Sequence, residues 1–154
     1  DVCPTKAIVG PYMLDARKCI SYLTIEHKSS IPLQYRKQIG NRVYGCDDCQ
    51  LYCPWNKFGQ MTKEDDFKVR HGLDDIELIE CFLWTEAEFI KYMEGSAILR
   101  IGYDQWLRNI AIGLGNAKTS ETIVNALKGR LNEASPLVKE HISWALAQHN
   151  FHMN

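Results

Sequence analysis

Five of the six cysteines in this chain lie within the first 53 residues, and their spacing constrains the fold more than any other feature. Three of them form the run Cys46-x2-Cys49-x3-Cys53-Pro. This run is the tail of the bacterial ferredoxin sequence C-x2-C-x2-C-x3-C-P, whose thiolates hold iron–sulfur clusters. Cys3 is also followed by proline. Two such Cys-Pro endings predict two half-motifs and therefore two [4Fe–4S] clusters.

The expected pairing of ligands follows from the two-cluster ferredoxins, in which the fourth cysteine of each run binds the other cluster. The second run lacks its first cysteine, because Val43 stands at that position, and Cys19 is the available substitute. We therefore predict four ligands for one cluster: Cys3, Cys19, Cys46 and Cys49. Cys53 would bind the other cluster with cysteines upstream. Because the chain begins at Asp1, inside a cysteine motif, we expect further sequence before it.

Zinc is the main alternative to iron for these cysteines. Structural zinc usually takes four ligands in two separated pairs, which fits this spacing less well. Disulfides need an oxidising compartment, and no basic and apolar leader precedes the motif. Cys81 stands alone in the sequence, and we expect it to be a buried small residue without a ligand role.

The composition is that of a globular protein, with 45% hydrophobic and 24% charged residues among 154. No apolar run approaches the roughly 20 residues of a membrane span, so we expect no membrane partner and a cytoplasmic location. The net charge of −1 divides into +3 for residues 1–57, −6 for 58–104 and +2 for 105–154. Two basic ends favour contact with a polyanion, although solvated surface charge explains the blocks equally well.

The first half of the chain predicts short elements around the cysteines. We expect an extended piece at Tyr12–Leu14 and a helix capped by Asp15 that runs to about His27, with Cys19 in its first half. Pro32 starts a second short helix that ends at Ile39, before Gly40. Residues 61–66 are polar and predict an exposed linker.

The second half reads as helical. Thr85 and Glu88 form a capping box, and further helices are expected over 103–116, from about 120 to 130, and from 135 to about 149. A shift of 32 residues aligns Trp106 with Val138 and Ile110 with Ile142, which indicates a helical repeat. Small residues would let paired helices approach closely, namely Ala111, Gly113 and Ala145. Such repeat units need neighbours, so we expect them to dock on the cysteine domain.

Together these patterns predict a mostly α protein with two domains. Residues 1–57 would form a partial bacterial ferredoxin-like [4Fe–4S] domain, residues 58–84 a linker, and residues 85–154 a HEAT-like helical repeat domain.

Three segments also resemble the epoxyqueuosine reductase family: residues 14–28, 45–57 and 106–117. The resemblance implies the last step of queuosine synthesis, in which an epoxide oxygen is removed from epoxyqueuosine at the tRNA wobble position. It implies two [4Fe–4S] clusters and a cobalamin, an N-terminal cobalamin domain outside this chain, and an electron donor. Reduced cobalt would attack the epoxide carbon, and the helical repeat would help to hold the tRNA.

The resemblance also implies which residues of this chain lie at the cobalamin, namely Ser21, Asp47 and Asp48. The alternative is that these residues are structural. Ser21 would then be an ordinary helix residue, and Asp47 and Asp48 would cap backbone amides in the loop. No catalytic residue is assigned within this chain. His27 is a conceivable cobalt ligand, but we expect it to satisfy the end of a helix.

Basic residues are candidates for tRNA contact, because phosphate binding requires placed lysines and arginines. In the helical half they are Arg108, Lys118, Lys128, Arg130 and Lys139, and around the cysteines Arg17, Lys18, Lys28 and Arg42. Two other functions remain open at this point. One is a ferredoxin-like electron carrier subunit, and the other is a zinc-stabilised RNA-binding adaptor.

Overall fold

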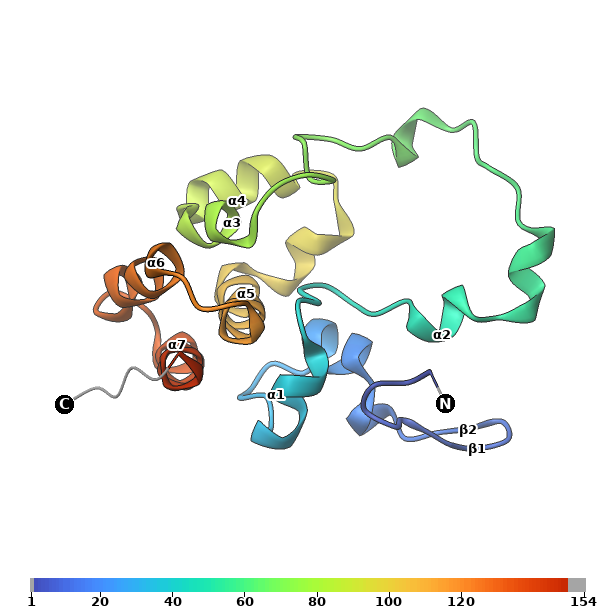
Figure 1. Cartoon of the computed structure of the whole chain (residues 1–154). Helices are drawn as coiled ribbons and strands as arrows, with labels where there is room; N and C mark the ends of the chain where they lie inside the picture. The colour runs from blue at the N-terminus through green and yellow to red at the C-terminus, as the bar shows by residue number, and fades with distance from the viewer. Residues whose placement is uncertain (1, 150–154) are drawn as a thin grey trace.

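The computed structural model describes residues 2–149, and most of them are helical. Figure 1 shows the N-terminal third at one end and a group of helices at the other. A long exposed segment, drawn in green and called the excursion below, includes residues 54–70 and leads to the helices. The sheet in the described residues is one antiparallel hairpin of β1 (Ile8–Gly10) and β2 (Met13–Leu14). The extended piece predicted before Asp15 is thus confirmed as a strand of this hairpin.

The helix predicted from Asp15 to His27 is interrupted, so this expectation is wrong. The carboxylate of Asp15 accepts from the backbone N–H of Arg17 and caps only one 3-10 turn, η1 (Ala16–Lys18). Cys19 then has extended backbone angles, φ −66° and ψ 128°. The chain becomes helical again at Ile20 and continues as a π-helix, η2 (Tyr22–Glu26). The break turns Cys19 toward the other cysteines, which a regular helix would not do.

The short helix predicted before Gly40 is confirmed as α1 (Leu33–Ile39), with Pro32 as the residue that precedes it. Gly40 ends the helix at φ +63°, a conformation that glycine adopts without strain. The chain then carries three short pieces: α2 (Asp48–Leu51), η3 (Pro54–Phe58) and η4 (Asp65–Phe67). Residues 54–70 are exposed throughout, which agrees with the exposed linker predicted at 61–66.

The segment 58–84, expected to be a linker, ends in a packed helix. This helix, α3 (Leu78–Leu83), buries Cys81 and Phe82 against the helical half. Cys81 is only 2% exposed, as expected for a small core residue, and burial raises the pKa of its thiol to about 11.

The helices predicted in the second half are present. They are α4 (Glu86–Met93), α5 (Tyr103–Asn116), α6 (Glu121–Leu131) and α7 (Pro136–Gln148). A 3-10 helix that was not predicted, η5 (Ala97–Ile101), lies between α4 and α5. The capping box of α4 is complete, because the N–H of Glu88 donates to the Thr85 hydroxyl while the N–H of Thr85 donates to the Glu88 carboxylate. Among residues 2–149, no helix has the length and apolar character that a membrane crossing requires.

Helix α5 is the centre of the molecule, since every residue from Gln105 to Gly115 is buried. It packs against α7, the other half of the predicted repeat, and a Cβ on Gly115 would lie 2.6 Å from the ring of Trp144. Gly113, which was expected at this contact, faces Leu78 instead. Gly115 is therefore the glycine that permits the close approach of α5 to α7.

The other side of α5 enters the cysteine half of the chain. Ile112 shares a small apolar core with Ile20, Leu23, Ile31 and Ile39. The helical repeat therefore docks directly on the segment that follows Cys19, as the need of repeat units for neighbours predicted.

Candidate metal centre

Four cysteines from separate segments line one cavity beside the hairpin. They are the predicted set Cys3, Cys19, Cys46 and Cys49. Cys3 precedes β1, Cys19 follows η1, Cys46 precedes α2, and Cys49 lies within α2. The remaining wall is mostly apolar, formed by Pro4, Ala7, Ile8, Leu14 and Ile20, with Asp48 at its edge.

The arrangement fits a multi-iron cluster. Thiolates are the soft ligands that iron–sulfur clusters take, and an apolar wall limits the access of water. Among the described residues, no group of three or more His, Cys, Asp or Glu converges as a site for a single metal ion. The four cysteines all line one cavity, and in an iron–sulfur cluster each thiolate binds a different iron.

The Cys3 thiol is held by its own loop. The backbone N–H of Ala7 donates to Cys3 Sγ at 3.2 Å, and the Thr5 hydroxyl lies 3.6 Å from the same sulfur. Burial raises the pKa of Cys3, but these hydrogen bonds outweigh it and bring the pKa below its ordinary value. Hydrogen bonds of this kind stabilise a thiolate, and at a cluster they raise the reduction potential.

The loop that carries Cys46 is fixed by two hydroxyls of the preceding helical segment. The N–H of Cys46 donates to Ser21 Oγ at 3.0 Å, and the N–H of Gly45 donates to Thr24 Oγ1 at 3.0 Å. Gly45 has a φ of +77°, a backbone conformation that would be strained in a residue with a side chain. The segment after Cys19 thereby sets the position of Cys46.

An ion pair lies at the edge of the cavity. Arg42 Nη2 donates to Asp48 Oδ2 at 2.7 Å, with both side chains partly exposed. Burial raises the pKa of the Cys46 thiol, the charge of Asp48 raises it further, and the charge of Arg42 opposes this. Arg42 therefore brings positive charge to the predicted cluster rather than to an open surface.

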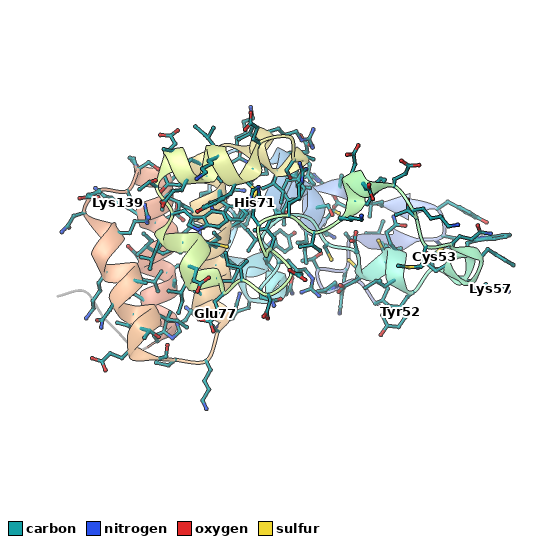
Figure 2. All side chains as sticks on the ribbon, turned by 90° about the horizontal axis from the view of Figure 1, so that it is seen from above. Tyr52, Cys53, Lys57, His71, Glu77 and Lys139 are labelled. Atoms are coloured by element: carbon teal, nitrogen blue, oxygen red, sulfur yellow. The ribbon has the colours of Figure 1, made fainter. Side chains whose placement is uncertain are left out.

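Cys53 does not line the cavity of the other four. It lines a neighbouring one with Val2, Tyr52, Pro54 and β1, and Cys49 belongs to both cavities. Figure 2 shows Tyr52, Cys53 and Lys57 at one end of the molecule and Lys139 at the other. Cys53 therefore lines a different cavity from Cys3, Cys19 and Cys46, while the crossed ligand pattern stays a prediction.

The three predicted cobalamin residues surround the Cys46 loop. The Ser21 hydroxyl is joined to the Cys46 backbone, and the Asp48 carboxylate is paired with Arg42. Asp47 is exposed, and its side chain makes no capping hydrogen bond to α2. His27 binds the Ser30 carbonyl oxygen at 3.0 Å and the Ser29 hydroxyl at 3.1 Å, which agrees with a structural role at the end of the π-helix.

Arg108 is not available to a tRNA, so this expectation is corrected. Its side chain is fully buried, and its guanidinium donates to the carbonyl oxygens of Leu23, His27 and Ser29. Arginine side chains are usually exposed, so residue type alone favours a surface position for Arg108. Its burial depends on a tertiary contact with the cysteine half.

The other basic candidates differ in how far they are exposed. Arg130 donates to the Tyr103 hydroxyl at 2.8 Å and to the Trp84 carbonyl oxygen at 3.0 Å. The exposed members are Arg17, Lys28, Lys118, Lys128 and Lys139, while Lys18 is half-buried. Arg17 and Lys18 both face the carboxylate of Asp15.

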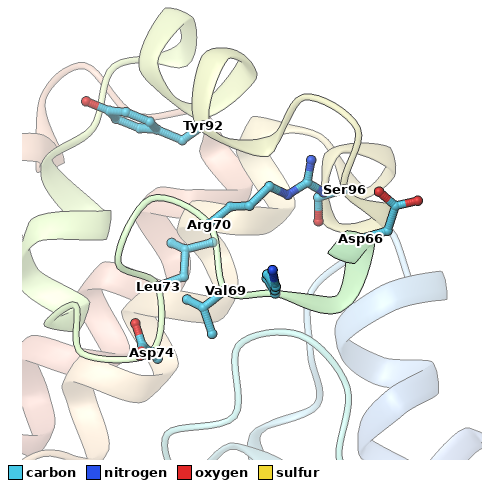
Figure 3. A pocket seen from close by; sticks show the side chains of 8 residues that line it. Asp66, Val69, Arg70, Leu73, Asp74, Tyr92 and Ser96 are labelled. Atoms are coloured by element: carbon cyan, nitrogen blue, oxygen red, sulfur yellow. The ribbon is translucent and has the colours of Figure 1, made fainter. Parts of the chain in front are cut away.

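Another cavity lies away from the cysteines, between the end of the excursion and α4. Figure 3 shows its lining, which includes Asp66, Arg70, Asp74, Tyr92 and Ser96. Arg70 donates to the carbonyl oxygen of Gly95 at 3.3 Å. The residues that line this cavity include no cysteine, and the bond from Arg70 joins residues 66–74 to the helical half.

Residues missed by the sequence analysis are those that hold the cysteine segments by hydrogen bonds. Thr24 and Asn109 carry no recognisable motif for this role, and both are fully buried. The only signal in the sequence is the presence of polar residues within apolar helical stretches.

Comparison with known proteins gives a consistent result at the level of sequence. Residues 1–56 match the family described as a 4Fe-4S double cluster binding domain. The chain is 58% identical over 149 residues to the epoxyqueuosine reductase of Pseudomonas aeruginosa, covering 97% of this chain and 41% of that protein. It is 59% identical over 147 residues to the Escherichia coli enzyme, covering 96% of this chain and 38% of that protein. The chain thus spans about two fifths of the length of these relatives.

Solved structures show the same fold. An epoxyqueuosine reductase from Bacillus subtilis superimposes with a TM-score of 0.88 at 29% identity, covering 97% of this chain and 40% of that one. A reductase solved with an epoxyqueuosine-modified tRNA-Tyr stem loop superimposes with a TM-score of 0.72 at 23% identity, covering 98% of this chain and 48% of that one. The backbone arrangement of this chain is therefore one that solved structures already show.

Proposed function

We propose that this chain is part of a protein of the epoxyqueuosine reductase family, and that it forms the iron–sulfur and helical part of an enzyme that reduces epoxyqueuosine in tRNA to queuosine. The observation that carries the proposal is the four-cysteine cavity, in a chain 58% identical to a reductase over 97% of its length. Because the match covers 41% of that relative, the complete reaction is proposed for the protein that carries this chain.

We assign each cysteine to a cluster according to the cavity that it lines. One [4Fe–4S] cluster takes Cys3, Cys19, Cys46 and Cys49, and Cys53 belongs to a second cluster. Since Cys49 lines both cavities, the two sites are neighbours, which favours passage of electrons from one to the other. A reducing cytosol is the compartment that suits such thiolate ligands.

Removal of an epoxide oxygen as water consumes two electrons and two protons. Each cluster delivers one electron at a time, so two clusters suit a two-electron reduction. A bound cobalamin would supply a reduced metal centre for the opening of the epoxide. The proposed role of this chain is to hold the clusters beside apolar side chains. The proton donor is proposed to lie outside this chain.

The cobalamin contacts proposed for this chain are Ser21, Asp47 and Asp48, all of which adjoin the predicted cluster ligands. Asp47 is the strongest of the three, because its carboxylate is exposed and does not cap the helix that follows. The Ser21 hydroxyl and the Asp48 carboxylate already have partners in the loop, so they would act on the cofactor through the shape of the site.

The proposed substrate is a tRNA that carries epoxyqueuosine. A solved structure of the same fold contains such a tRNA stem loop. The exposed lysines of the helical half, which include Lys118, Lys128 and Lys139, are the proposed phosphate contacts.

The test is anaerobic turnover by the protein that carries this chain. It is supplied with cobalamin, a low-potential reductant and tRNA bearing epoxyqueuosine, and the modified nucleoside is analysed by mass spectrometry. We expect loss of one oxygen atom from the nucleoside, abolished by Cys19→Ser and retained by Cys81→Ser. A protein that shows reducible clusters but leaves the nucleoside unchanged would be an electron carrier instead.

A further inference from the structure

We propose that Arg108 and Asn109 form a positioning pair, through which helix α5 sets the separation of the two segments that carry Cys19 and Cys46. The pair belongs to the helical half, which the family resemblance connects with tRNA. Its contacts instead face the cysteine half. The inference rests on the proposed cluster for its functional meaning, but the contacts can be tested without a metal.

Asn109 bridges the two segments directly. Its Nδ2 donates to the carbonyl oxygen of Thr24 at 2.8 Å and to that of Val43 at 2.8 Å. Thr24 lies in the π-helix that follows Cys19, and Val43 lies three residues before Cys46. One fully buried carboxamide thus uses both of its N–H groups to join two strands of chain that are otherwise separate in sequence.

Arg108 fixes the orientation of this carboxamide. Its Nε and Nη2 donate to Asn109 Oδ1 at 3.0 and 2.9 Å, so the amide N–H groups must point toward the cysteine half. Its other N–H groups donate to the carbonyl oxygens of the π-helix and the turn after it. Burial lowers the pKa of Arg108 to about 10, which still leaves the guanidinium charged at neutral pH.

The connection continues from Asn109 to the predicted ligand. Thr24, whose carbonyl oxygen Asn109 holds, accepts the N–H of Gly45 at 3.0 Å through its hydroxyl. Ser21 on the same segment accepts the N–H of Cys46. Ser21 and Thr24 are three residues apart in one helical segment, so both hydroxyls face the same loop.

The position of Val43 shows why the cysteine loop needs the contact from Asn109. It stands where a regular ferredoxin run would have a cysteine, so the chain has no metal bond at this point. The hydrogen bond from Asn109 to the Val43 carbonyl oxygen supplies an anchor at that position instead. The helical half thereby replaces one fixed point of the cluster loop.

The test compares Asn109→Leu with Asn116→Leu in the protein that carries this chain. Leucine keeps about the same side-chain size but removes the donors. Asn116, the last residue of α5, is the matched control. Its Nδ2 donates to the carbonyl oxygens of Arg36 and Gly40, in a segment that carries no cysteine. Both substitutions remove buried hydrogen bonds, so both are expected to lower the melting temperature.

The first readout is hydrogen–deuterium exchange in the apoprotein. We expect Asn109→Leu to accelerate exchange of peptides over residues 43–49 by about tenfold or more, the factor that a loss of 1.4 kcal/mol produces. Asn116→Leu should leave those peptides unchanged. Equal acceleration in both variants, or none in Asn109→Leu, would overturn the proposal.

The second readout is the cluster itself, measured as iron retained and as the midpoint potential. Asn109→Leu should lose iron faster than Asn116→Leu at an equal loss of melting temperature, and the potential of its remaining cluster should shift. If the unsubstituted protein takes up no cluster, the proposed function fails, while the exchange experiment still decides whether the pair positions the loop.

Discussion

Ser21 and Cys46 are joined through a single hydroxyl, which accepts the N–H of Cys46 at 3.0 Å and lies 3.4 Å from its carbonyl oxygen. The two residues are 25 positions apart in the sequence. This contact ties the segment after Cys19 to the loop of Cys46, so it brings two predicted ligands to one cavity.

Replacing Ser21 by alanine should therefore destabilise the loop. The N–H of Cys46 would lose its partner, at a cost of about 1–3 kcal/mol in the free energy of unfolding. Denaturant unfolding of the apoprotein measures the change, with Ser21→Thr as the control that keeps a hydroxyl. Equal stability of Ser21→Ala and the unsubstituted protein would show that the hydroxyl does not hold the loop.

The ion pair of Arg42 and Asp48 should tune the reduction potential of the cluster. Arg42→Gln removes a positive charge beside Cys46, which disfavours the more negative reduced cluster and lowers the potential. Asp48→Asn removes a negative charge and should raise it. Redox titration followed by electron paramagnetic resonance gives both values. Shifts of the same sign in the two variants would contradict this electrostatic account.

His141 should make the fold sensitive to acid. Its Nε2 accepts the N–H of Ile31 at 3.2 Å, and Nδ1 lies 2.8 Å from the Leu137 carbonyl oxygen, so the buried ring is neutral. Burial lowers the pKa of His141 from 6.5 to about 4, with Arg36 and Arg108 adding to the effect and Glu140 opposing it.

Between these two pKa values, only the unfolded chain takes up a proton at this ring. Stability contributed by His141 is therefore full above pH 6.5 and is lost as the pH falls toward about 4. His141→Gln should lower the melting temperature of the apoprotein at pH 7 but flatten its dependence on pH. An unchanged pH profile in this variant would show that another group is responsible.

Two glycines in the helical half should respond in opposite directions to alanine. In Gly115→Ala the new Cβ would lie 2.8 Å from the Ala145 Cα, so α5 and α7 must separate and stability falls by about 1–3 kcal/mol. Gly129 lies within α6 with nothing within 4 Å of an added Cβ, so Gly129→Ala should stabilise by about 0.4–1 kcal/mol. Thermal unfolding measures both, and a neutral Gly115→Ala would contradict the close packing.

The local signals of the sequence predicted the helical half well. The capping box at Thr85 and the proline after Ser135 mark helix starts that the structure confirms, because caps depend on residues within one turn. The four cysteines grouped by the crossed-ligand rule, with Cys19 as the substitute for Val43, line one cavity. Their role as cluster ligands remains a proposal.

Features that depend on tertiary contact could not be predicted. The break at Cys19 is invisible to hydrophobic periodicity, because Ile20 and Leu23 keep helical spacing after it. The burial of Arg108 requires carbonyl acceptors from residues about 80 positions earlier. Gly115, rather than the predicted Gly113, faces α7. Which of the two glycines does so depends on how α5 is rotated about its axis, and the small residues of the sequence do not determine that rotation.

Metal analysis of the protein that carries this chain tests the central claim most directly. Iron and acid-labile sulfide are measured after anaerobic reconstitution, with an electron paramagnetic resonance spectrum after reduction, for the unsubstituted protein, Cys19→Ser and Cys81→Ser. We predict that Cys19→Ser loses the iron and sulfide of one [4Fe–4S] cluster while Cys81→Ser loses none. Full iron in Cys19→Ser, or stoichiometric zinc without a reduced-cluster signal, would contradict the assignment.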